Sequence, residues 1–202
     1  MSTTAGQETV LKVGARADAQ RDRILCAAQK CFIENGFHAA SMASIADAAQ
    51  MSAGLMYRYF DNKNAIVLAI IERQIEERRA AIRQLHSTDI AARLLQIFEQ
   101  WRTGDPRIMS AALFLEMSAE ATRNPQIAAA LLSSDTMTRT EFQAWLSRSP
   151  DDGGLGVPAA AAASKALLFQ CVVEGLALRA VREPDLDAVQ VQAALDDLFE
   201  IL

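Results

Sequence analysis

The sequence predicts an all-α protein: an N-terminal helix-turn-helix domain joined by a long connector helix to a larger helical domain. Three observations support this fold class. Apolar residues make up 51% of the 202-residue chain but aromatic residues only 6%, and alanine, a strong helix former, is abundant. Apolar positions recur at helical spacing along most of the chain. Breaks that contain glycine or proline separate these segments, and the chain is long enough to bury a sizeable core.

The first helix is expected from about residue 17 to residue 35. Residues 1–15 are polar and include two glycines, so we expect them to form a flexible tail. Ile24, Ala28 and Phe32 then share one helical face. Asn35-Gly36 is expected to end the helix, because glycine adopts the left-handed conformation that a helix C-cap requires.

Residues 41–60 are expected to form two short helices with a tight turn between them. Ser41 can cap the first helix, whose apolar face carries Ile45, Ala46 and Ala49.

The turn is expected at Gln50-Met51, and Ser52 can cap the second helix, over 52–60. Met56 and Phe60 are expected to pack inward. The outer face of this second helix then carries small and hydrogen-bonding residues, which suits entry into a DNA major groove.

A long connector helix is expected from about residue 62 to residue 86, because an apolar first half is followed by a charged second half. Five further helices are expected after it. Their approximate ranges are 88–103, 106–122, 125–148, 159–181 and 187–202, with the clearest loop at Ser149–Pro158. The expected domains are a tail at 1–15, a helix-turn-helix domain at 16–64 and a larger helical domain at 65–202, for which the family resemblance given below implies ligand (effector) binding and dimerisation.

The net charge of −5 is unevenly distributed. Residues 1–86 hold eleven Lys and Arg against nine Asp and Glu, whereas residues 87–202 hold nine against sixteen. The N-terminal part is therefore slightly basic, which permits DNA binding without proving it. Neither a signal-peptide pattern nor an uncharged run of about 20 residues occurs, so we expect a cytoplasmic protein with no membrane partner.

Several classes of chemistry lack support in the sequence. It contains no P-loop, GxGxxG, HExxH or nucleophile-elbow motif. Cys26, Cys31 and Cys171 form no CxxC pair, so buried, reduced thiols are expected, with a redox sensor as the alternative. The two histidines lie far apart, and Glu116 and Glu120 share a helix face without a positioned catalytic partner. We therefore expect no enzyme, no cofactor and no metal site.

A set of residues within 16–70 has the order and spacing of a known family. It comprises Asn35-Gly36-Phe37, Ser41, Ile45-Ala46, Ala49, Ser52, Gly54, Tyr57-Arg58-Tyr59-Phe60, Lys63 and Ala65-Ile66. This set resembles the TetR family of bacterial transcriptional regulators. Gln50 departs from the family pattern, which usually has glycine in the turn, where a positive φ carries no steric cost. The remaining two-thirds of the chain resemble the family in helix count and layout.

The resemblance implies a homodimeric, repressor-like regulator. Each subunit would place its 52–60 helix in a major groove of a palindromic operator, with half-sites about 34–36 Å apart. The larger domain would bind a small effector and change the spacing of the two DNA-reading heads. The alternative is a helical ligand-binding or protein-interaction module that has lost DNA binding.

The resemblance also assigns DNA-contacting positions. Those expected to face the bases are Ala43, Ala53, Gly54, Leu55 and Arg58, and those expected to contact phosphates are Ser41, Ser52, Tyr57, Tyr59 and Lys63. Arg58 is the base-facing residue able to make a bidentate contact to guanine. The aromatic residues could instead be core residues, and Arg58 a solvated surface charge.

Bulky apolar residues with two polar anchors are the candidates for the effector pocket. They are Phe98, Trp101, Met109, Leu113, Phe114, Glu116, Met117, Phe142, Trp145, Phe169 and Gln170. Each could instead be a core residue. A mostly apolar pocket favours a hydrophobic or amphipathic effector, and a cationic one if Glu116 faces inward.

The last two helices carry more apolar residues than one subunit needs. This surplus predicts a four-helix dimer interface, with an intrasubunit core as the competing interpretation. The candidate interface residues are Leu167, Cys171, Leu178, Leu195, Leu198 and Phe199.

Overall fold

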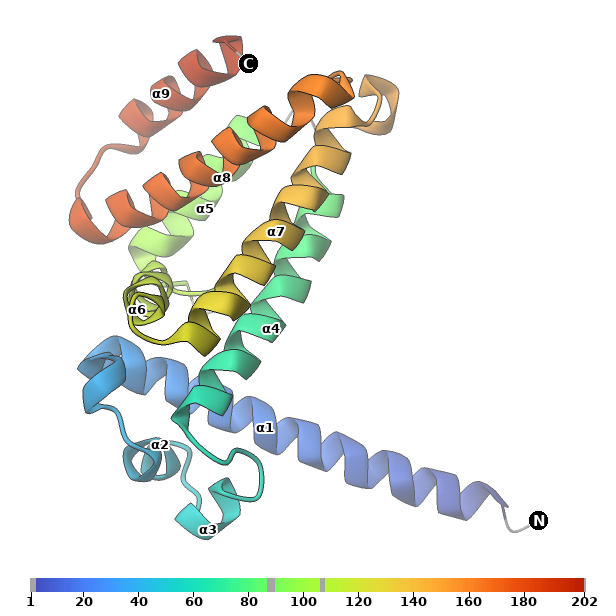
Figure 1. The fold of residues 1–202 in the computed structure, drawn as a ribbon, viewed down its shortest axis with the longest axis vertical. Helices are drawn as coiled ribbons and strands as arrows, with labels where there is room; N and C mark the ends of the chain where they lie inside the picture. Colours follow the sequence, from blue (N-terminus) through green and yellow to red (C-terminus); the bar gives the residue numbers. More distant parts are fainter. Residues whose placement is uncertain (1–2, 87–89, 106–107, 202) are drawn as a thin grey trace. The chain divides into compact units, whose positions relative to one another are not determined.

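The computed structural model describes residues 3–86, 90–105 and 108–201, with side chains described from residue 16 to residue 200 within these ranges (Figure 1). Within this part of the chain the regular structure is helical, with nine α-helices and a 3₁₀ turn at Pro150–Asp152. The predicted all-α fold class is confirmed. The chain forms two compact units, Met1–Ile70 (unit 1) and Ile71–Leu202 (unit 2).

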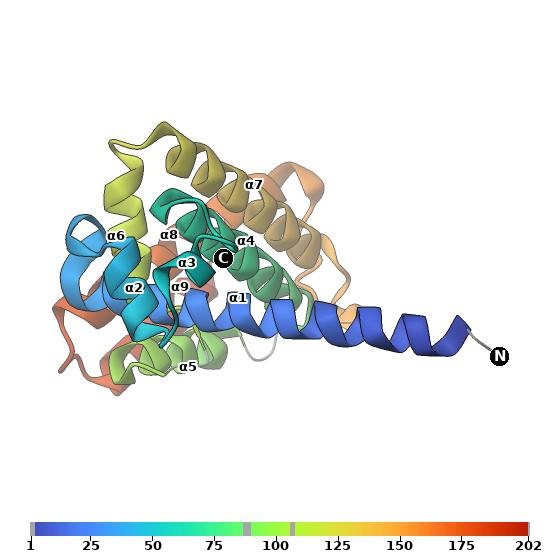
Figure 2. The ribbon, with the colours of Figure 1, turned by 90° about the horizontal axis from the view of Figure 1, so that it is seen from below.

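Unit 1 contains α1 (Thr3–Ala39), α2 (Met42–Ala48), α3 (Ala53–Met56) and the beginning of α4 (Lys63–Arg83). α1 starts well before the predicted residue 17, so the helix extends into the range that we expected to be a flexible tail. Its regular geometry is interrupted at Gly36, whose φ of 75° and ψ of 161° are non-helical. The predicted break after Asn35 is therefore present. α2 packs on α1, and α3 packs on α2 (Figures 1 and 2).

The core of unit 1 is formed by the apolar faces that the sequence pattern predicts. Met56 and Phe60, which follow the turn of the helix-turn-helix, are 0% and 3% exposed. Further buried residues come from α1, α2 and α4: Ile24, Leu25, Ala28, Phe32, Ile45, Ala46, Ala49, Ile66, Val67 and Ile70. The local periodicity of the sequence is thus sufficient to place this core.

Unit 2 contains the remainder of α4 and five further helices, α5 (Ile90–Thr103), α6 (Ala111–Ala121), α7 (Pro125–Ser147), α8 (Ala159–Arg182) and α9 (Ala188–Ile201). α8 is central, because it packs against α5, α6 and α7 (Figure 1). α9 packs on α5. The five helices agree with the predicted ones, although α6 starts later than residue 106.

The core of unit 2 is built around a group of aromatic rings. The Phe169 ring centre lies 5.4 Å from that of Trp145, 5.7 Å from that of Phe142 and 5.4 Å from that of Phe199. The indole N–H of Trp145 donates to the carbonyl oxygen of Gly153 at 3.1 Å. This hydrogen bond satisfies a buried polar group and ties α7 to the loop that precedes α8.

Candidate functional site

The first helix of the helix-turn-helix is fixed by a capping box. The Ser44 amide donates to Ser41 Oγ at 3.0 Å, and the Ser41 amide donates to Ser44 Oγ at 2.9 Å. These two bonds satisfy amides that the first turn of a helix leaves unpaired. The predicted N-cap at Ser41 is confirmed, and Ala43 in the same turn is exposed.

The turn between α2 and α3 contains Gln50 in a left-handed conformation, with a φ of 52°. The Gln50 amide donates to the Asp47 carbonyl at 2.9 Å and the Met51 amide to the Ala46 carbonyl at 3.0 Å, which is the pattern of a helix C-cap closed by a left-handed residue. Arg23 Nη2 also donates to the Gln50 carbonyl at 2.7 Å. Glutamine thus adopts the geometry that glycine favours, and its side chain adds a steric cost.

We expect Gln50→Gly to raise the free energy of unfolding of unit 1 by about 0.5–1 kcal/mol. Relief of the left-handed strain, about 1–2 kcal/mol, should exceed the extra backbone entropy of glycine in the unfolded chain. Urea denaturation followed by far-UV circular dichroism measures the change. Gln50→Ala is the matched control, because it keeps the Cβ atom and should give no gain. A Gln50→Gly protein less stable than the wild type would contradict this account.

The second helix, α3, is shorter than predicted. Ser52 caps it, since its Oγ accepts the Leu55 amide at 3.2 Å, but the helix ends at Met56 rather than at residue 60. The Arg58 amide bonds to Leu55 and the Tyr59 amide to Met56, at 3.2 and 2.9 Å, so these bonds reach back three residues instead of four. The chain therefore tightens into turns after one helical turn.

The predicted DNA-contacting residues, with three exceptions, are exposed. Leu55, Tyr59 and Lys63 are half-buried. The exposed ones are Ser41, Ala43, Ser52, Ala53, Gly54, Tyr57 and Arg58. Beyond the adjacent residues and the backbone of its own helix, no described atom lies within 4 Å of the position that a Cβ atom would take on Gly54, so this part of α3 is open to a partner. The exposed set is compatible with the expected DNA-facing surface.

Lys63, predicted to contact phosphate, makes hydrogen bonds within unit 1 in this structure. Its ammonium donates to the carbonyl oxygens of Ala40 at 2.8 Å, of His38 at 3.3 Å and of Phe37. It also lies 4.3 Å from the centre of the Phe37 ring, a cation–π contact. Because these carbonyls match the three N–H donors of an ammonium group, Lys63 joins the start of α4 to the end of α1 and to Ala40, which follows it.

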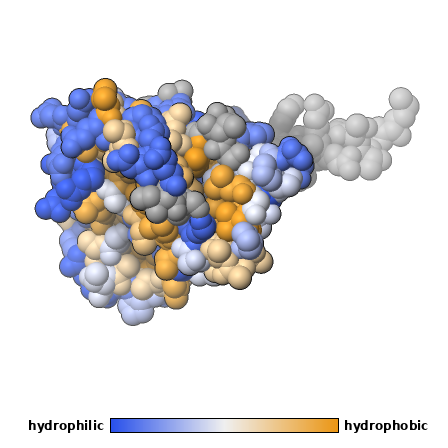
Figure 3. All heavy atoms as spheres, turned by 90° about the horizontal axis from the view of Figure 1, so that it is seen from above, coloured by the Kyte–Doolittle hydropathy of each residue, from blue (hydrophilic) through white to orange (hydrophobic). Residues whose placement is uncertain are grey.

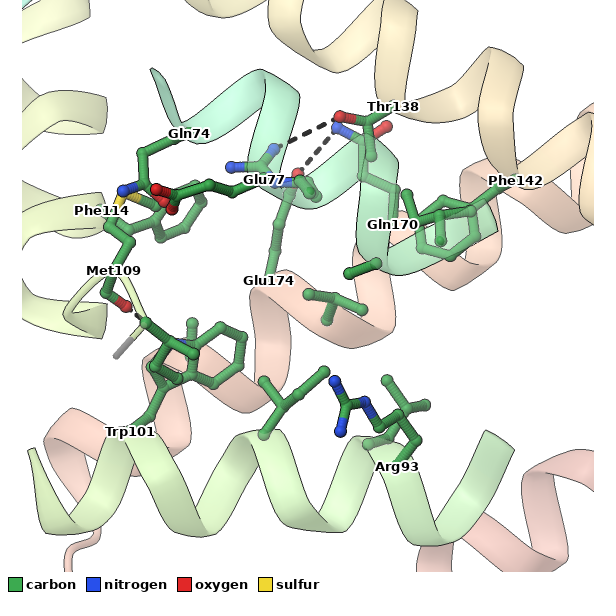
Figure 4. Close-up of a pocket in the computed structure, with 18 of the residues that line it drawn as sticks. Gln74, Glu77, Arg93, Trp101, Met109, Phe114, Thr138, Phe142, Gln170 and Glu174 are labelled. Atoms are coloured by element: carbon green, nitrogen blue, oxygen red, sulfur yellow. Dashed lines mark hydrogen bonds between the residues drawn. The ribbon is translucent and has the colours of Figure 1, made fainter. Parts of the chain in front are cut away.

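Unit 2 encloses a cavity of about 370 Å³. It is lined by residues of α4, α5, α6, α7 and α8 and of the segment before α6 (Figure 4). Five of the predicted pocket residues are among them: Trp101, Met109, Phe114, Phe142 and Gln170. The Trp101 indole N–H donates to the Met109 carbonyl at 2.9 Å, which holds the two side by side in the wall.

The other six predicted pocket residues lie outside the cavity wall. Phe98, Leu113, Met117, Trp145 and Phe169 are buried in the core instead, and Glu116 is half-buried on α6. Helical periodicity shows which side of a helix faces inward, but a core and a cavity lie on the same side. Because Glu116 does not line the cavity, it gives no support for a cationic effector.

Polar residues that the sequence interpretation missed form part of the wall. They are Gln74, Glu77, Arg78, Arg93, Gln100, Asp135, Thr138 and Glu174. On α4 the cavity residues Gln74, Glu77, Arg78, Ala81 and Ile82 keep helical spacing. That mixed stripe is the signal that could have revealed them. From the sequence, the charged second half of this helix is interpreted only as part of a connector between the two domains.

A carboxylate on α7 fixes this part of α4. Glu141 accepts from Arg79 Nε at 2.8 Å and from Arg83 Nη2 at 2.6 Å, and its side chain is 14% exposed. The hydrogen bond from Arg83, with that from Arg79, lowers the pKa of Glu141 below its usual value. The bridge holds the α4 wall of the cavity against α7.

The predicted interface residues fall into two groups. Leu167 and Cys171 on α8 are exposed, and Leu178 is half-buried. On α9, Leu195 is 3% exposed while Leu198 and Phe199 are half-buried, and Phe199 packs on Phe169, so part of α9 belongs to the core of its own subunit. Apolar side chains gather on the face of the molecule seen in Figure 3.

α8 itself is unusually apolar. It is long and apolar enough, by length and composition, to cross a membrane, and 28% of its apolar stretch is buried. Core helices of soluble proteins meet the same criterion. Within the described residues, no group of three or more His, Cys, Asp or Glu side chains could hold a metal ion.

Comparisons with known proteins match both units. Residues 24–70 match the family described as bacterial regulatory proteins, tetR family, and residues 90–202 match the C-terminal domain of BetI-type transcriptional repressors. The chain is 37% identical over 142 residues to the HTH-type transcriptional regulator UidR of Escherichia coli K12, covering 68% of this chain and 69% of UidR. It is 36% identical over 67 residues to the transcriptional activator FasR of Mycolicibacterium smegmatis, covering 33% of this chain and 31% of FasR.

Solved structures show the same fold. Salmonella enterica GusR superposes with a TM-score of 0.67 at 28% identity, over 90% of this chain and 96% of GusR. A transcriptional regulator from Saccharomonospora viridis, solved in complex with choline, superposes with a TM-score of 0.66 at 18% identity, over 91% and 96% of the two chains. These matches are to regulators, which confirms the prediction that the protein is not an enzyme. Both domain matches and the similarity to UidR show that the chain belongs to the TetR family of bacterial transcriptional regulators.

Proposed function

We propose that the protein is a cytoplasmic, ligand-responsive repressor that binds a palindromic operator as a homodimer and is released by a small amphipathic effector. One observation carries the proposal: α4 supplies residues to unit 1, which holds the helix-turn-helix, and to the wall of the cavity in unit 2. A ligand that shifts α4 would change the spacing of the two DNA-reading heads. The match of residues 90–202 to repressor C-terminal domains supports the direction of regulation.

The exposed face of the helix-turn-helix supports DNA binding. Ala43, Ala53 and Gly54 are small enough to let the backbone approach base edges, and hydroxyls of Ser41 and Tyr57 are suitable phosphate contacts. The charged member of the base-facing set is Arg58. Specific affinity should therefore depend strongly on this one guanidinium.

We expect Arg58→Ala to weaken operator binding by about 1–3 kcal/mol and to relax discrimination at one base position, because a bidentate contact to guanine is lost. Fluorescence anisotropy with operator variants measures both effects. Arg58→Lys is the matched control: it keeps the charge but not the bidentate geometry, so it should lose discrimination more than affinity. Equal weakening on all sequences for both variants would show a phosphate contact instead.

The alternative function is a helical ligand-binding or protein-interaction module that has lost DNA binding. The N-terminal part has only a small basic excess, which is the observation that favours this alternative. Binding to the DNA upstream of the protein's own gene, measured at several salt concentrations, separates the two functions. Phosphate contacts require that affinity falls steeply as salt rises. Absence of salt-dependent binding would favour the alternative.

The exposed side of α8 is the proposed dimer surface. Leu167 is 46% exposed and Leu168 is 39% exposed, beside the exposed Cys171. We expect Leu167→Glu to give monomers in sedimentation velocity experiments, because it places a charge in an apolar interface. Leu132→Glu on α7, where the leucine is 64% exposed, is the matched control and should remain dimeric. A wild-type protein that is monomeric at all concentrations would contradict the proposed dimer.

A further inference from the structure

One end of the cavity in unit 2 is polar, and some of its hydrogen-bonding groups lack partners among the described residues. It is formed by Arg78 of α4, Asp135 and Thr138 of α7, and Gln170 and Glu174 of α8. Figure 4 shows Thr138, Gln170 and Glu174 close together, while Trp101, Met109 and Phe114 lie across the cavity from them.

Arg78 has more hydrogen-bonding capacity than its neighbours use. A guanidinium carries five N–H donors, and the bond that Arg78 makes here is a long one from Nη1 to Thr138 Oγ1, at 3.4 Å. In the part of the chain that the structure describes, Arg78 forms no ion pair within 4 Å. Burial lowers its pKa, and the charges of Asp135 and Glu174 offset this only in part.

The acceptors at this end include a half-buried carboxyl group and one buried oxygen that has no partner within the described residues. Burial raises the pKa of Asp135, against the attraction of Arg78 and Arg139. Gln170 Nε2 donates to Glu174 Oε1 at 3.0 Å, and Gln170 Oε1 is buried without a hydrogen-bond partner. Turning the amide around would place its oxygen against the carboxylate, so the present orientation is favoured and the bare atom is an acceptor.

We propose that the effector carries a zwitterionic head group, with a protonated nitrogen facing Asp135 and Glu174 and an anionic group facing Arg78. This inference rests on the proposed function, in which the cavity is the effector site. A purely anionic head group would be repelled by the two carboxylates, and a purely cationic one would be repelled by the guanidinium. An apolar ligand would leave these groups buried and unpaired.

The apolar part of the wall defines the remainder of the ligand. Trp101, Met109 and Phe114 line the cavity across from the polar end, so a short chain that ends in an aromatic ring fits them (Figure 4). The proposed class is therefore an amino-acid-like zwitterion with an aromatic or branched apolar tail.

Four probes with one common tail test the head group: 2-amino-4-phenylbutanoate, 4-phenylbutanoate, 4-phenylbutylamine and 4-phenylbutanamide. Isothermal titration calorimetry on the full chain should show that the zwitterion binds at least about tenfold more tightly than each of the others, because it alone satisfies both charges. Equal affinities, absence of binding, or tightest binding by another probe would overturn the proposal.

Two variants that each remove one charge assign the two ends of the head group. Arg78→Met should weaken the zwitterion about tenfold and bring it close to the amine, while Asp135→Asn should weaken it about tenfold and bring it close to the carboxylate. Arg182→Met and Asp185→Asn are charge-matched controls at exposed positions outside the cavity, and they should leave the ranking unchanged. An unchanged ranking in either cavity variant would overturn the proposal.

Release of operator DNA is measured separately by anisotropy. A zwitterion that binds as described but releases no DNA would refute the proposed repressor function and leave the head-group assignment intact. If a singly charged probe binds most tightly and also releases DNA, the head-group assignment is refuted and the proposed repressor function is kept.

Discussion

Replacement of Trp145 by alanine should lower the free energy of unfolding of unit 2 by about 3–5 kcal/mol. The indole is 0% exposed, packs against the Phe169 ring and donates to the Gly153 carbonyl at 3.1 Å. The substitution therefore creates a cavity and also leaves a buried carbonyl unpaired. Urea denaturation monitored by the fluorescence of the remaining tryptophan, Trp101, measures the loss.

Trp101→Ala is the matched control for this change. Trp101 is half-buried in the cavity wall, so its removal should cost less stability but should abolish binding of an aromatic-tailed probe. The loss of stability of Trp145→Phe should lie between those of Trp101→Ala and Trp145→Ala, since this substitution keeps most of the packing and loses the N–H donor. A Trp145→Ala protein as stable as the wild type would show that this residue belongs to a cavity and not to the core.

The helix-turn-helix could be predicted closely because its determinants are local. Ser41 and Ser52 cap the helices that they precede, and Met56 and Phe60 are buried at the positions that the apolar spacing indicates. These are relations between residues at most a few positions apart. The sequence also placed the turn at Gln50, but whether a glutamine would accept a positive φ depends on the neighbours that surround it.

The role of Lys63 could not be predicted from its position in the motif. Its ammonium binds carbonyl oxygens that lie 23 to 26 residues earlier in the chain, including those of Phe37 and Ala40. Such a long-range arrangement depends on how α1 and α4 meet in unit 1. A cation beside a DNA-reading helix therefore supports a phosphate contact only when its own donors are not used within the fold.

Which residues line the cavity also depends on long-range packing and could be predicted even less well from the sequence. Phe98 and Trp101 are three residues apart on α5, yet Phe98 belongs to the core and Trp101 to the cavity wall. The difference is set by what the other helices place opposite each side chain, which periodicity does not report. The charged wall residues, such as Arg78 and Asp135, were missed because charged residues on a helix usually face solvent. Here too, the helices that pack opposite them decide where they lie.

Replacement of Met56 by alanine should abolish specific DNA binding although Met56 faces away from the DNA-reading surface. It is the buried residue of the four-residue α3 and is 0% exposed, so its loss should cost about 2–5 kcal/mol and release α3 from the core of unit 1. Hydrogen exchange should become faster across 42–60, and anisotropy should show no operator binding. Both tryptophans lie in unit 2, so the fluorescence-detected unfolding transition should stay unchanged. Met42→Ala, at a half-buried position on α2, should have a much smaller effect. Intact operator binding by the Met56→Ala protein would show that α3 is held by other contacts.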